Sequence, residues 1–176
     1  TATVFEALPA SGVAVVPADD DHTPLWRERA AGHRVMTFSD TDRGGDVWGE
    51  GEWQGAVWQL MAQTPQGELR CALRIPGRHN LRNALAVIAC ALAAGVPLAA
   101  VAQGLEAFEP VKGRSRCLPL TLNGRAITVV DDSYNANPDS VRAAIEVLAT
   151  LPAPRLLVLG DMGEVGEAGV AFHQEV

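Results

Sequence analysis

The sequence predicts an α/β protein in two parts, and three observations support this. Residues 12–38 follow a strand–helix–strand rhythm. Residues 56–62 and 68–75 alternate apolar and polar side chains, which is typical of antiparallel strands with one solvated face. Residues 109–113, Glu-Pro-Val-Lys-Gly, then interrupt the pattern before a second α/β stretch begins. We therefore expect one domain over residues 1–111 and a second over residues 112–176.

The first elements follow from short apolar runs and their flanking residues. Residues 12–16 and 34–38 are predicted strands, and the intervening helix, residues 22–31, is expected to be capped by Asp21. Residues 37–51 are acidic and rich in glycine, which favours a loop or a weak edge strand.

The antiparallel pair that follows is predicted to turn at Pro65-Gln66-Gly67. Trp53 and Trp58 are interpreted as packing residues on this sheet rather than as stacking platforms for a ligand.

A polar cluster at residues 77–83, Gly-Arg-His-Asn-Leu-Arg-Asn, lies where a predicted strand ends and a helix begins. In α/β proteins such corners lie at the carboxyl edge of the sheet, where ligands bind. Asn80 is suited to cap an apolar, buried helix over residues 83–94, and Asn83 projects from roughly the same face. A carboxamide has donors and an acceptor, which suit the edge of adenine. At this point an adenine site and a simple cap beside an exposed loop residue, His79, both stay open.

The second part begins with a hairpin signal, since Asn-Gly at residues 123–124 separates two strand-like runs. A polar stretch leads to Pro138, which is expected to start a helix reaching about residue 151, with Asn137 as its cap. Residues 156–159, Leu-Leu-Val-Leu, are a predicted buried strand.

Composition limits the possible functions. The chain has 176 residues, a net charge of −7 and a pI near 5.0, so no general basic surface for nucleic acid is expected. The longest apolar run, residues 83–103, is broken by Gly95 and Pro97, so no membrane insertion is expected. Three widely spaced cysteines fit neither a zinc site nor a disulfide framework and favour a cytoplasmic setting. Cys71 and Cys90 are interpreted as core residues.

Four separate stretches together resemble the Mur ligases, the ATP-dependent amide-forming enzymes of peptidoglycan synthesis. Their order and spacing match that family from about Phe5 to the end of the chain. The stretches are Gly77-Arg78-His79-Asn80 with Asn83, Pro110-Val111-Lys112-Gly113-Arg114, Asp131 to Pro138, and Gly160-Asp161-Met162-Gly163-Glu164.

Within the family, Asp132 to Pro138 is similar to the ligase that adds D-alanyl-D-alanine to the UDP-N-acetylmuramoyl-tripeptide. The preceding ligase of the series has Tyr-Ala-His-Thr-Pro in that place. The resemblance implies that residues 1–111 are the end of a mononucleotide-binding central domain with an antiparallel β extension. Residues 112–176 would be the first part of a Rossmann-like C-terminal domain.

The resemblance also implies a mechanism that uses ATP and Mg²⁺. ATP phosphorylates the terminal carboxylate of the tripeptide, and the amine of D-alanyl-D-alanine then attacks the acyl phosphate. Magnesium neutralises phosphate charge during the transfer.

By position, the resemblance assigns eight residues to ligands. His79, Asn80 and Asn83 would hold the adenine side of ATP, Arg114 would act catalytically at the phosphates, Asp132 would bind the ribose, and Tyr134, Asn135 and Asn137 would shape the acceptor side. Structural alternatives stay open for three of them. Arg114 would otherwise be a solvated linker charge, Asp132 the end of a strand, and Asn137 a helix cap.

The chain also departs from the family pattern. No Gly-x-x-x-x-Gly-Lys-Thr loop is present in the sequence, and Pro17 stands where the family usually has Asn before Ala-Asp-Asp. The family's metal-binding Glu and His and its modified Lys would lie before Thr1, and no metal ligand is assigned within the chain. We therefore expect an internal fragment of a ligase that is inactive by itself.

Two other interpretations are kept. One is a non-catalytic folded fragment or weak adenine-binding module. The other is a related ligase such as folylpolyglutamate synthase, against which the stretch from Tyr134 to Pro138 argues.

Overall fold

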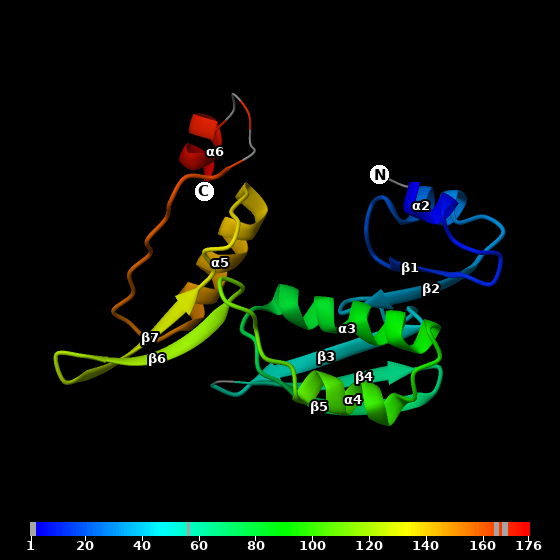
Figure 1. Cartoon of the computed structure of the whole chain (residues 1–176), viewed down its shortest axis with the longest axis horizontal. Coiled ribbons are helices and arrows are strands. Elements are labelled where there is room, and N and C mark those ends of the chain that lie inside the picture. The colour runs from blue at the N-terminus through cyan, green and yellow to red at the C-terminus, as the bar shows by residue number, and fades with distance from the viewer. Residues whose placement is uncertain (1–2, 56, 164–165, 167–168) are drawn as a thin grey trace. The chain divides into compact units, whose positions relative to one another are not determined.

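A computed structural model of the chain describes residues 3–55, 57–163, 166 and 169–176 (Figure 1). These residues form two compact units. Unit 1 comprises Thr1–Arg74 and Asn80–Phe108, and unit 2 comprises Ile75–His79 and Glu109–Val176. Both combine helices with strands, so the predicted α/β class is confirmed. The predicted domain boundary between residues 111 and 112 stays a prediction.

Unit 1 contains one mixed five-stranded sheet with the strands in chain order. The first three strands run parallel, and the last three form an antiparallel meander, which matches the predicted extension. The strands are β1 (Val13–Pro17), β2 (Arg34–Ser39), β3 (Val47–Trp53), β4 (Trp58–Thr64) and β5 (Gly67–Leu73).

Strand β3 lies in the centre of the sheet, so the prediction of a loop or weak edge strand over residues 37–51 was wrong. Two glycines explain why such a polar stretch occupies a central position. A Cβ on Gly49 would lie 2.7 Å from Leu85 Cδ2, and one on Gly51 would lie 2.8 Å from Leu81 Cδ1. Glycine is required there because it lets a helix pack closely on the strand.

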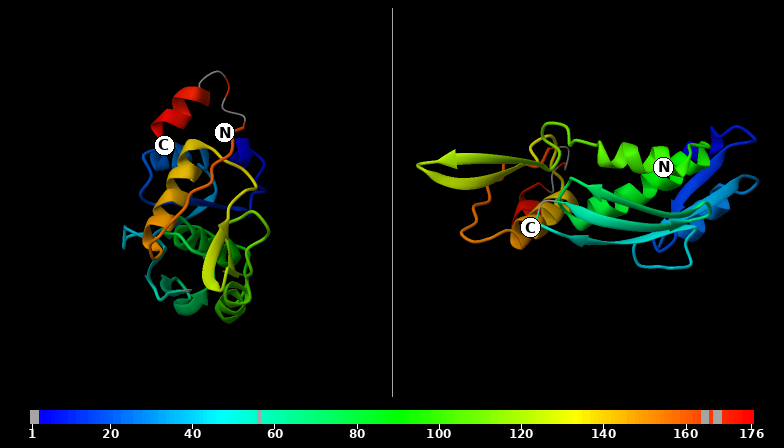
Figure 2. Two further views of the ribbon diagram at one scale, coloured as in Figure 1. Left: turned by 90° about the vertical axis from the view of Figure 1, so that its left-hand side faces the viewer. Right: turned by 90° about the horizontal axis from the view of Figure 1, so that it is seen from below.

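That helix is α3 (Arg78–Ala93), which with α4 (Leu98–Glu106) covers one face of the β3–β5 part of the sheet (Figure 2). The core between them contains Leu60, Leu85 and Ile88, which are at most 2% exposed. The shorter helices of unit 1 are α1 (Thr3–Glu6) and α2 (Thr23–Arg29).

Helix α3 corrects two predictions. It starts at Arg78, five residues earlier than predicted, so Asn80 lies inside the helix and is not its N-cap. It is also amphipathic rather than buried all round, since Val87 is 52% exposed and Cys90 is exposed. Of the two cysteines predicted to be in the core, only Cys71 is buried.

Two further details concern local contacts. Asp21 does not cap α2, because His22 occupies the N-cap position without a side-chain cap bond. Trp53 and Trp58 pack on the sheet as predicted, since they pair across β3 and β4 with ring centroids 5.3 Å apart. Whether either ring also stacks on a ligand stays a prediction.

Unit 2 contains the predicted hairpin, formed by β6 (Arg116–Leu122) and β7 (Arg125–Asp131). Asn123 and Gly124 both have positive φ, 51° and 76°, which is the geometry that an Asn-Gly turn provides. The predicted helix is also present as α5 (Pro138–Thr150), followed later by α6 (Gly169–Glu175).

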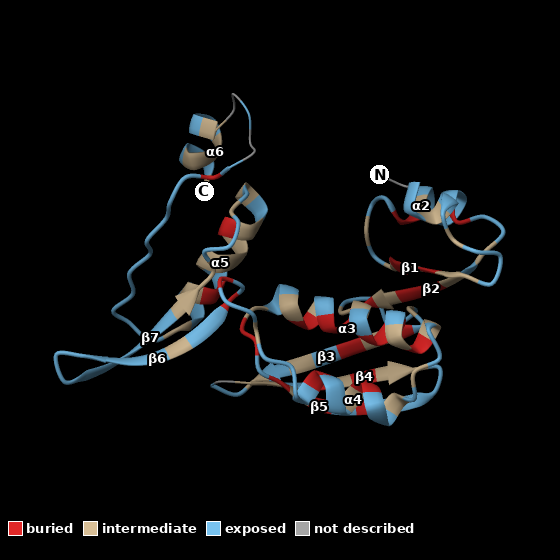
Figure 3. Cartoon of the chain, viewed as in Figure 1, coloured by how far each residue is buried: buried red, intermediate tan, exposed pale blue. Residues whose placement is uncertain are grey.

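The predicted buried strand at residues 156–159 is wrong, because these residues form no strand and are exposed (Figure 3). Leu156 is 83% exposed and Val158 85%. In the described part of unit 2 the sheet consists of β6 and β7, neither of which pairs with this run. A strand needs a neighbouring strand for its backbone hydrogen bonds. Without one, an apolar run such as residues 156–159 does not form a strand.

Candidate functional site

An amide pair lies in the first part of α3. Asn83 Nδ2 donates a hydrogen bond to Asn80 Oδ1 at 3.3 Å, so the two carboxamides share one helical face as predicted. Asn83 is exposed and Asn80 half-buried. The pair thus presents amide groups to solvent close to the strand-to-helix corner, where a planar ligand edge can be read.

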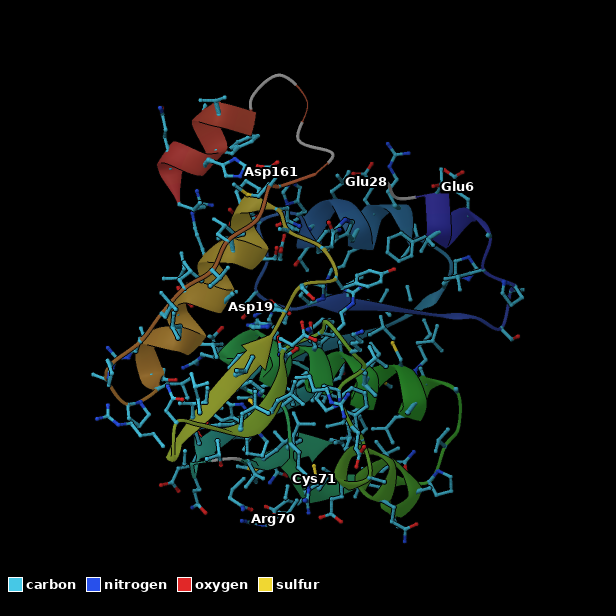
Figure 4. The ribbon with its side chains drawn as sticks, turned by 60° about the vertical axis from the view of Figure 1, so that its left-hand side comes forward. Glu6, Asp19, Glu28, Arg70, Cys71 and Asp161 are labelled. Atoms are coloured by element: carbon cyan, nitrogen blue, oxygen red, sulfur yellow. The ribbon has the colours of Figure 1, made fainter. Side chains whose placement is uncertain are left out.

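Arg82 lies between Asn80 and Asn83 in the sequence and forms a charged network that the sequence did not predict. Its Nη2 donates to Asp19 Oδ1 at 2.6 Å and its Nη1 to Asp19 Oδ2 at 3.0 Å. Nη1 also donates to Asp40 Oδ1 at 2.8 Å. Asp19, labelled in Figure 4, follows the carboxyl end of β1, and Asp40 directly follows β2. The sequence did contain a sign of this network. Both carboxylates come just after predicted strands, and the carboxyl ends of parallel strands meet at one edge of a sheet.

Hydroxyl groups complete this network. Ser39 Oγ donates to Asp19 Oδ2 at 2.8 Å, and the Thr41 hydroxyl donates to the same oxygen. Ser39 is fully buried, and its Oγ accepts hydrogen bonds from the backbone N–H groups of Thr41 and Asp42. The loop after β2 is therefore tied to the loop after β1 through one carboxylate.

The network shifts the acid–base behaviour of its members. The hydrogen bond from Arg82, helped by the Thr41 and Ser39 hydroxyls, holds the pKa of Asp19 well below its usual value, although burial acts in the opposite direction. The bond to Asp19 raises the pKa of Arg82 in turn. Asp19 and Arg82 are therefore a charged pair near neutral pH.

Unit 2 contains a second cluster, in which two carboxylates fold a loop around Gly113. Asp131 Oδ2 accepts from Gly113 N at 3.1 Å, and Asp132 Oδ1 accepts from both the N–H and the hydroxyl of Ser115, at 2.8 and 3.2 Å. Gly113 has a φ of 77°, and a Cβ there would lie 2.9 Å from Tyr134 N. Asp132 directly follows β7. Through its hydrogen bonds with Ser115 it also holds the loop that carries Arg114.

Arg114 itself is exposed, and its guanidinium carbon lies 4.1 Å from the centroid of the Tyr134 ring. Such stacking of a guanidinium on an aromatic ring is favourable and leaves its N–H groups at the edge. The structure therefore brings together two of the predicted site residues within unit 2. Arg114 is not a linker charge without contacts.

His79 lies in the short part of unit 2 that precedes Asn80. Desolvation by neighbouring groups lowers the pKa of His79, while the carboxylates of Asp132 and Glu146 act to raise it. The backbone turns sharply before it, at Gly77, whose φ is 95°. A Cβ on Gly77 would lie 2.5 Å from the His79 ring, so this turn requires glycine.

The remaining predicted residues make local hydrogen bonds. Asn137 accepts from Ser140 N through its side chain, and Ser140 Oγ accepts from Asn137 N, both at 2.9 Å. This is a capping box at the start of α5, so the cap interpretation of Asn137 is confirmed. Asn135 Oδ1 accepts from the N–H of the next residue, Ala136, at 2.9 Å. A contact of either residue with a substrate stays a prediction.

Two features are absent from the described residues. No group of three or more His, Cys, Asp or Glu side chains there is arranged to hold a metal ion. None of the helices seen in the described part of the chain has the length and apolar character needed to cross a membrane.

Comparison with known families assigns both parts of the chain. The model of the Mur ligase middle domain matches residues 1–91, which is more than half of the sequence. The chain belongs to the Mur ligase family. The model of the Mur ligase glutamate ligase domain matches residues 113–176. The two sequence matches flank the residues at which the predicted domains meet.

Individual Mur ligases extend this result. The chain is 38% identical over 173 residues to the UDP-N-acetylmuramoyl-tripeptide--D-alanyl-D-alanine ligase of Haemophilus influenzae, covering 98% of the chain and 36% of that relative. Among solved structures, MurF from Acinetobacter baumannii has a TM-score of 0.88 at 36% identity, covering 99% of the chain and 37% of that structure. The chain thus spans just over a third of the relatives that it matches.

A more distant Mur ligase supports the fold alone. MurF from Thermotoga maritima, solved in complex with ADP, has a TM-score of 0.75 at 23% identity, covering 94% of the chain and 37% of that structure.

Proposed function

We propose that this chain is the nucleotide-handling part of an ATP-dependent ligase that joins D-alanyl-D-alanine to the UDP-N-acetylmuramoyl-tripeptide. The name of the Haemophilus relative, which states its two substrates, supports this choice of substrates. So does the stretch from Asp132 to Pro138, which resembles the D-alanyl-D-alanine-adding ligase rather than its predecessor. The three free cysteines are compatible with the reducing cytoplasm in which we place the enzyme.

The exposed amide pair of α3 is the observation that carries the proposal. Asn80 and Asn83 present carboxamides that can donate to and accept from the edge of adenine, and they keep a common face through their own hydrogen bond. His79 would lie on the same side of ATP, and its lowered pKa favours a neutral ring near neutral pH. A neutral ring suits contact with an uncharged base.

By position in the sequence, the family resemblance assigns the rest of the nucleotide to polar residues that belong to unit 2. Asp132, already ordered by Ser115, would accept hydrogen bonds from the ribose hydroxyls. Arg114, whose guanidinium lies over the Tyr134 ring, would direct its N–H groups at phosphate oxygens. Asn135 and Asn137 are assigned to the acceptor side of the site, where Asn137 also caps α5.

The proposed reaction has two steps. A carboxylate oxygen of the tripeptide attacks the γ-phosphorus of ATP, and the bond to the β–γ bridging oxygen breaks to release ADP. The amine of D-alanyl-D-alanine then attacks the acyl phosphate carbon, loses a proton, and expels inorganic phosphate as the amide forms. Arg114 would stabilise negative charge on the phosphoryl oxygens in the first step, as charge passes from the attacking carboxylate to the oxygen that leaves with ADP.

Magnesium fits this chemistry but not these residues. Since the described part of the chain lacks a cluster of metal ligands, we assign no magnesium ligand to it. The family's phosphate loop is likewise absent from the sequence. The proposed role of the chain is therefore to recognise the nucleotide, to stabilise phosphoryl charge through Arg114, and to form part of the acceptor site.

The test uses the full-length protein that carries this sequence, supplied with ATP, UDP-N-acetylmuramoyl-tripeptide and D-alanyl-D-alanine. We expect phosphate release that depends on all three substrates and a product with the added dipeptide, detected by mass. Turnover with a folate and glutamate instead would assign it to the folylpolyglutamate synthases and overturn the proposal. The purified 176-residue chain should show no turnover under the same conditions, because it lacks the Gly-rich loop and its lysine. Turnover by that chain would contradict our placement of the phosphate site.

A further inference from the structure

Arg82 links the helix turn that carries the amide pair to the two parallel strands beside it. Its guanidinium forms two hydrogen bonds with Asp19 and one with Asp40, at 2.6 to 3.0 Å. The Asp40 side chain is 7% exposed and that of Asp19 16%, so most of this ion network is shielded from solvent. Phe38 lies below the guanidinium at 5.9 Å. All these residues belong to unit 1.

The position of Arg82 in the helix gives this link a consequence for ligand binding. Arg82 lies between Asn80 and Asn83, within the same turn of α3. On the core side, Leu81 packs against Gly51, which fixes how closely the helix approaches the sheet. The buried face of α3 begins at Leu81 and Ala84, so the first turn has few apolar contacts of its own. A forked guanidinium bound to two separate loops adds a second restraint on the rotation of this turn.

We propose that Arg82 is a positioning residue for nucleotide recognition. Through Asp19 and Asp40 it fixes the rotation of the first part of α3 at the carboxyl edge of the sheet, and so the direction of the Asn80 and Asn83 amides. This inference rests on the proposed function, which assigns those amides to adenine.

The chemistry of the network fits a positioning role in addition to any effect on stability. Desolvation of the charges offsets much of their attraction in a shielded ion pair, although removal of one partner is costly because the other charge is left unpaired. The network also imposes a definite geometry, since each donor must meet its acceptor. Here one carboxylate, Asp19, also accepts from the Ser39 and Thr41 hydroxyls, so the geometry of both loops is transmitted to the helix.

The experiment measures base discrimination rather than activity alone. In the full-length enzyme, kcat/KM is compared for ATP and for purine riboside triphosphate, which lacks the 6-amino group. We expect Asn83→Ala, Arg82→Ala and Asp19→Asn each to reduce the preference for ATP by roughly 3- to 10-fold, the range of one hydrogen bond. Arg82→Lys should restore little of the preference, because an ammonium group cannot bind both carboxylates in the same geometry.

The matched control is Arg70→Ala. Arg70 pairs with Glu68 at 2.6 Å on β5, and both side chains are largely exposed, at 73% and 42%. Like Arg82→Ala, this change removes one arginine charge from unit 1. It should leave the preference for ATP at the wild-type value. Equal loss in the control would mean that discrimination reports general destabilisation and would overturn the proposal.

Two other outcomes separate the hypotheses. If Asn83→Ala reduces discrimination while Arg82→Ala and Asp19→Asn do not, the positioning role is wrong and the adenine assignment stands. If Asn83→Ala has no effect on discrimination, both are wrong. Should Arg82→Ala fail to fold, Asp19→Asn decides the question, because it is isosteric and acts from a different element.

Discussion

The guanidinium of Arg114 stacks on the ring of Tyr134, with 4.1 Å between the guanidinium carbon and the ring centroid. The loop is shaped for this contact, since Tyr134 N donates to Gly113 O at 3.0 Å. In the full-length enzyme we expect Arg114→Ala to lower kcat by roughly 10²- to 10³-fold, because charge shifts onto the phosphate oxygens during the reaction. Steady-state kinetics with ATP as the varied substrate checks this.

Tyr134→Ala should lower kcat by a smaller factor, roughly 2- to 5-fold, through the loss of this stacking at an exposed site. Tyr134→Phe retains the ring and should behave like wild type. In an Arg114→Ala background, Tyr134→Ala should have no further effect on kcat. An additive effect in the double variant would show that Tyr134 acts on the substrate directly, independently of Arg114.

Asn83→Ala should raise the KM for ATP more than it lowers kcat. Adenine is remote from the reacting phosphorus, so its contacts are made equally in the ground and transition states. Loss of a neutral hydrogen-bonding partner should cost about 1–3 kcal/mol, or roughly 5- to 150-fold in affinity. Cys90→Ala, an exposed change on the same helix, is the control. An unchanged KM in a variant with a wild-type unfolding temperature would exclude the adenine assignment.

Asn137→Ala should mainly reduce stability. It removes the acceptor for Ser140 N and opens the capping box of α5, which should cost about 0.5–2 kcal/mol of unfolding free energy. Asn137→Asp keeps an acceptor there and should retain most of the stability. Denaturant unfolding measures both variants. If Asn137→Asp is fully stable but has a raised KM for D-alanyl-D-alanine, the carboxamide also contacts the acceptor, as the resemblance implies.

The Asp19–Arg82 pair should make stability depend on acid pH. Because the folded-state pKa of Asp19 is lowered, its contribution to stability is present above the ordinary carboxyl pKa, about 4, and is lost as pH falls below it. Asp19→Asn should therefore be less stable than wild type at pH 7, and the difference should narrow in acid. Unfolding measured from pH 7 down to pH 3 checks this, with Glu68→Gln as the exposed control. A difference that is independent of pH would mean that Asp19 acts by shape rather than charge.

Much of the structure was predictable because it depends on neighbouring residues. Asn-Gly at residues 123–124 determines the hairpin turn, since both positions require positive φ. The start of α5 is determined by Asn137 and Pro138, because an N-cap and a proline at the first helical position act only on the first turn of a helix. The common face of Asn80 and Asn83 follows from their spacing alone. The family resemblance rests on the same kind of local information, which is short motifs in a fixed order.

The tertiary structure decided what depends on distant partners. Helix α3 begins at Arg78 rather than at Asn83, and Arg82 acquires its role only because the ends of β1 and β2 bring Asp19 and Asp40 to it. Strand β3 is central because its glycines admit α3, which no local pattern reveals. Residues 156–159 are apolar enough for a buried strand, yet a strand also needs a neighbour for its backbone hydrogen bonds, and the described part of unit 2 offers them none.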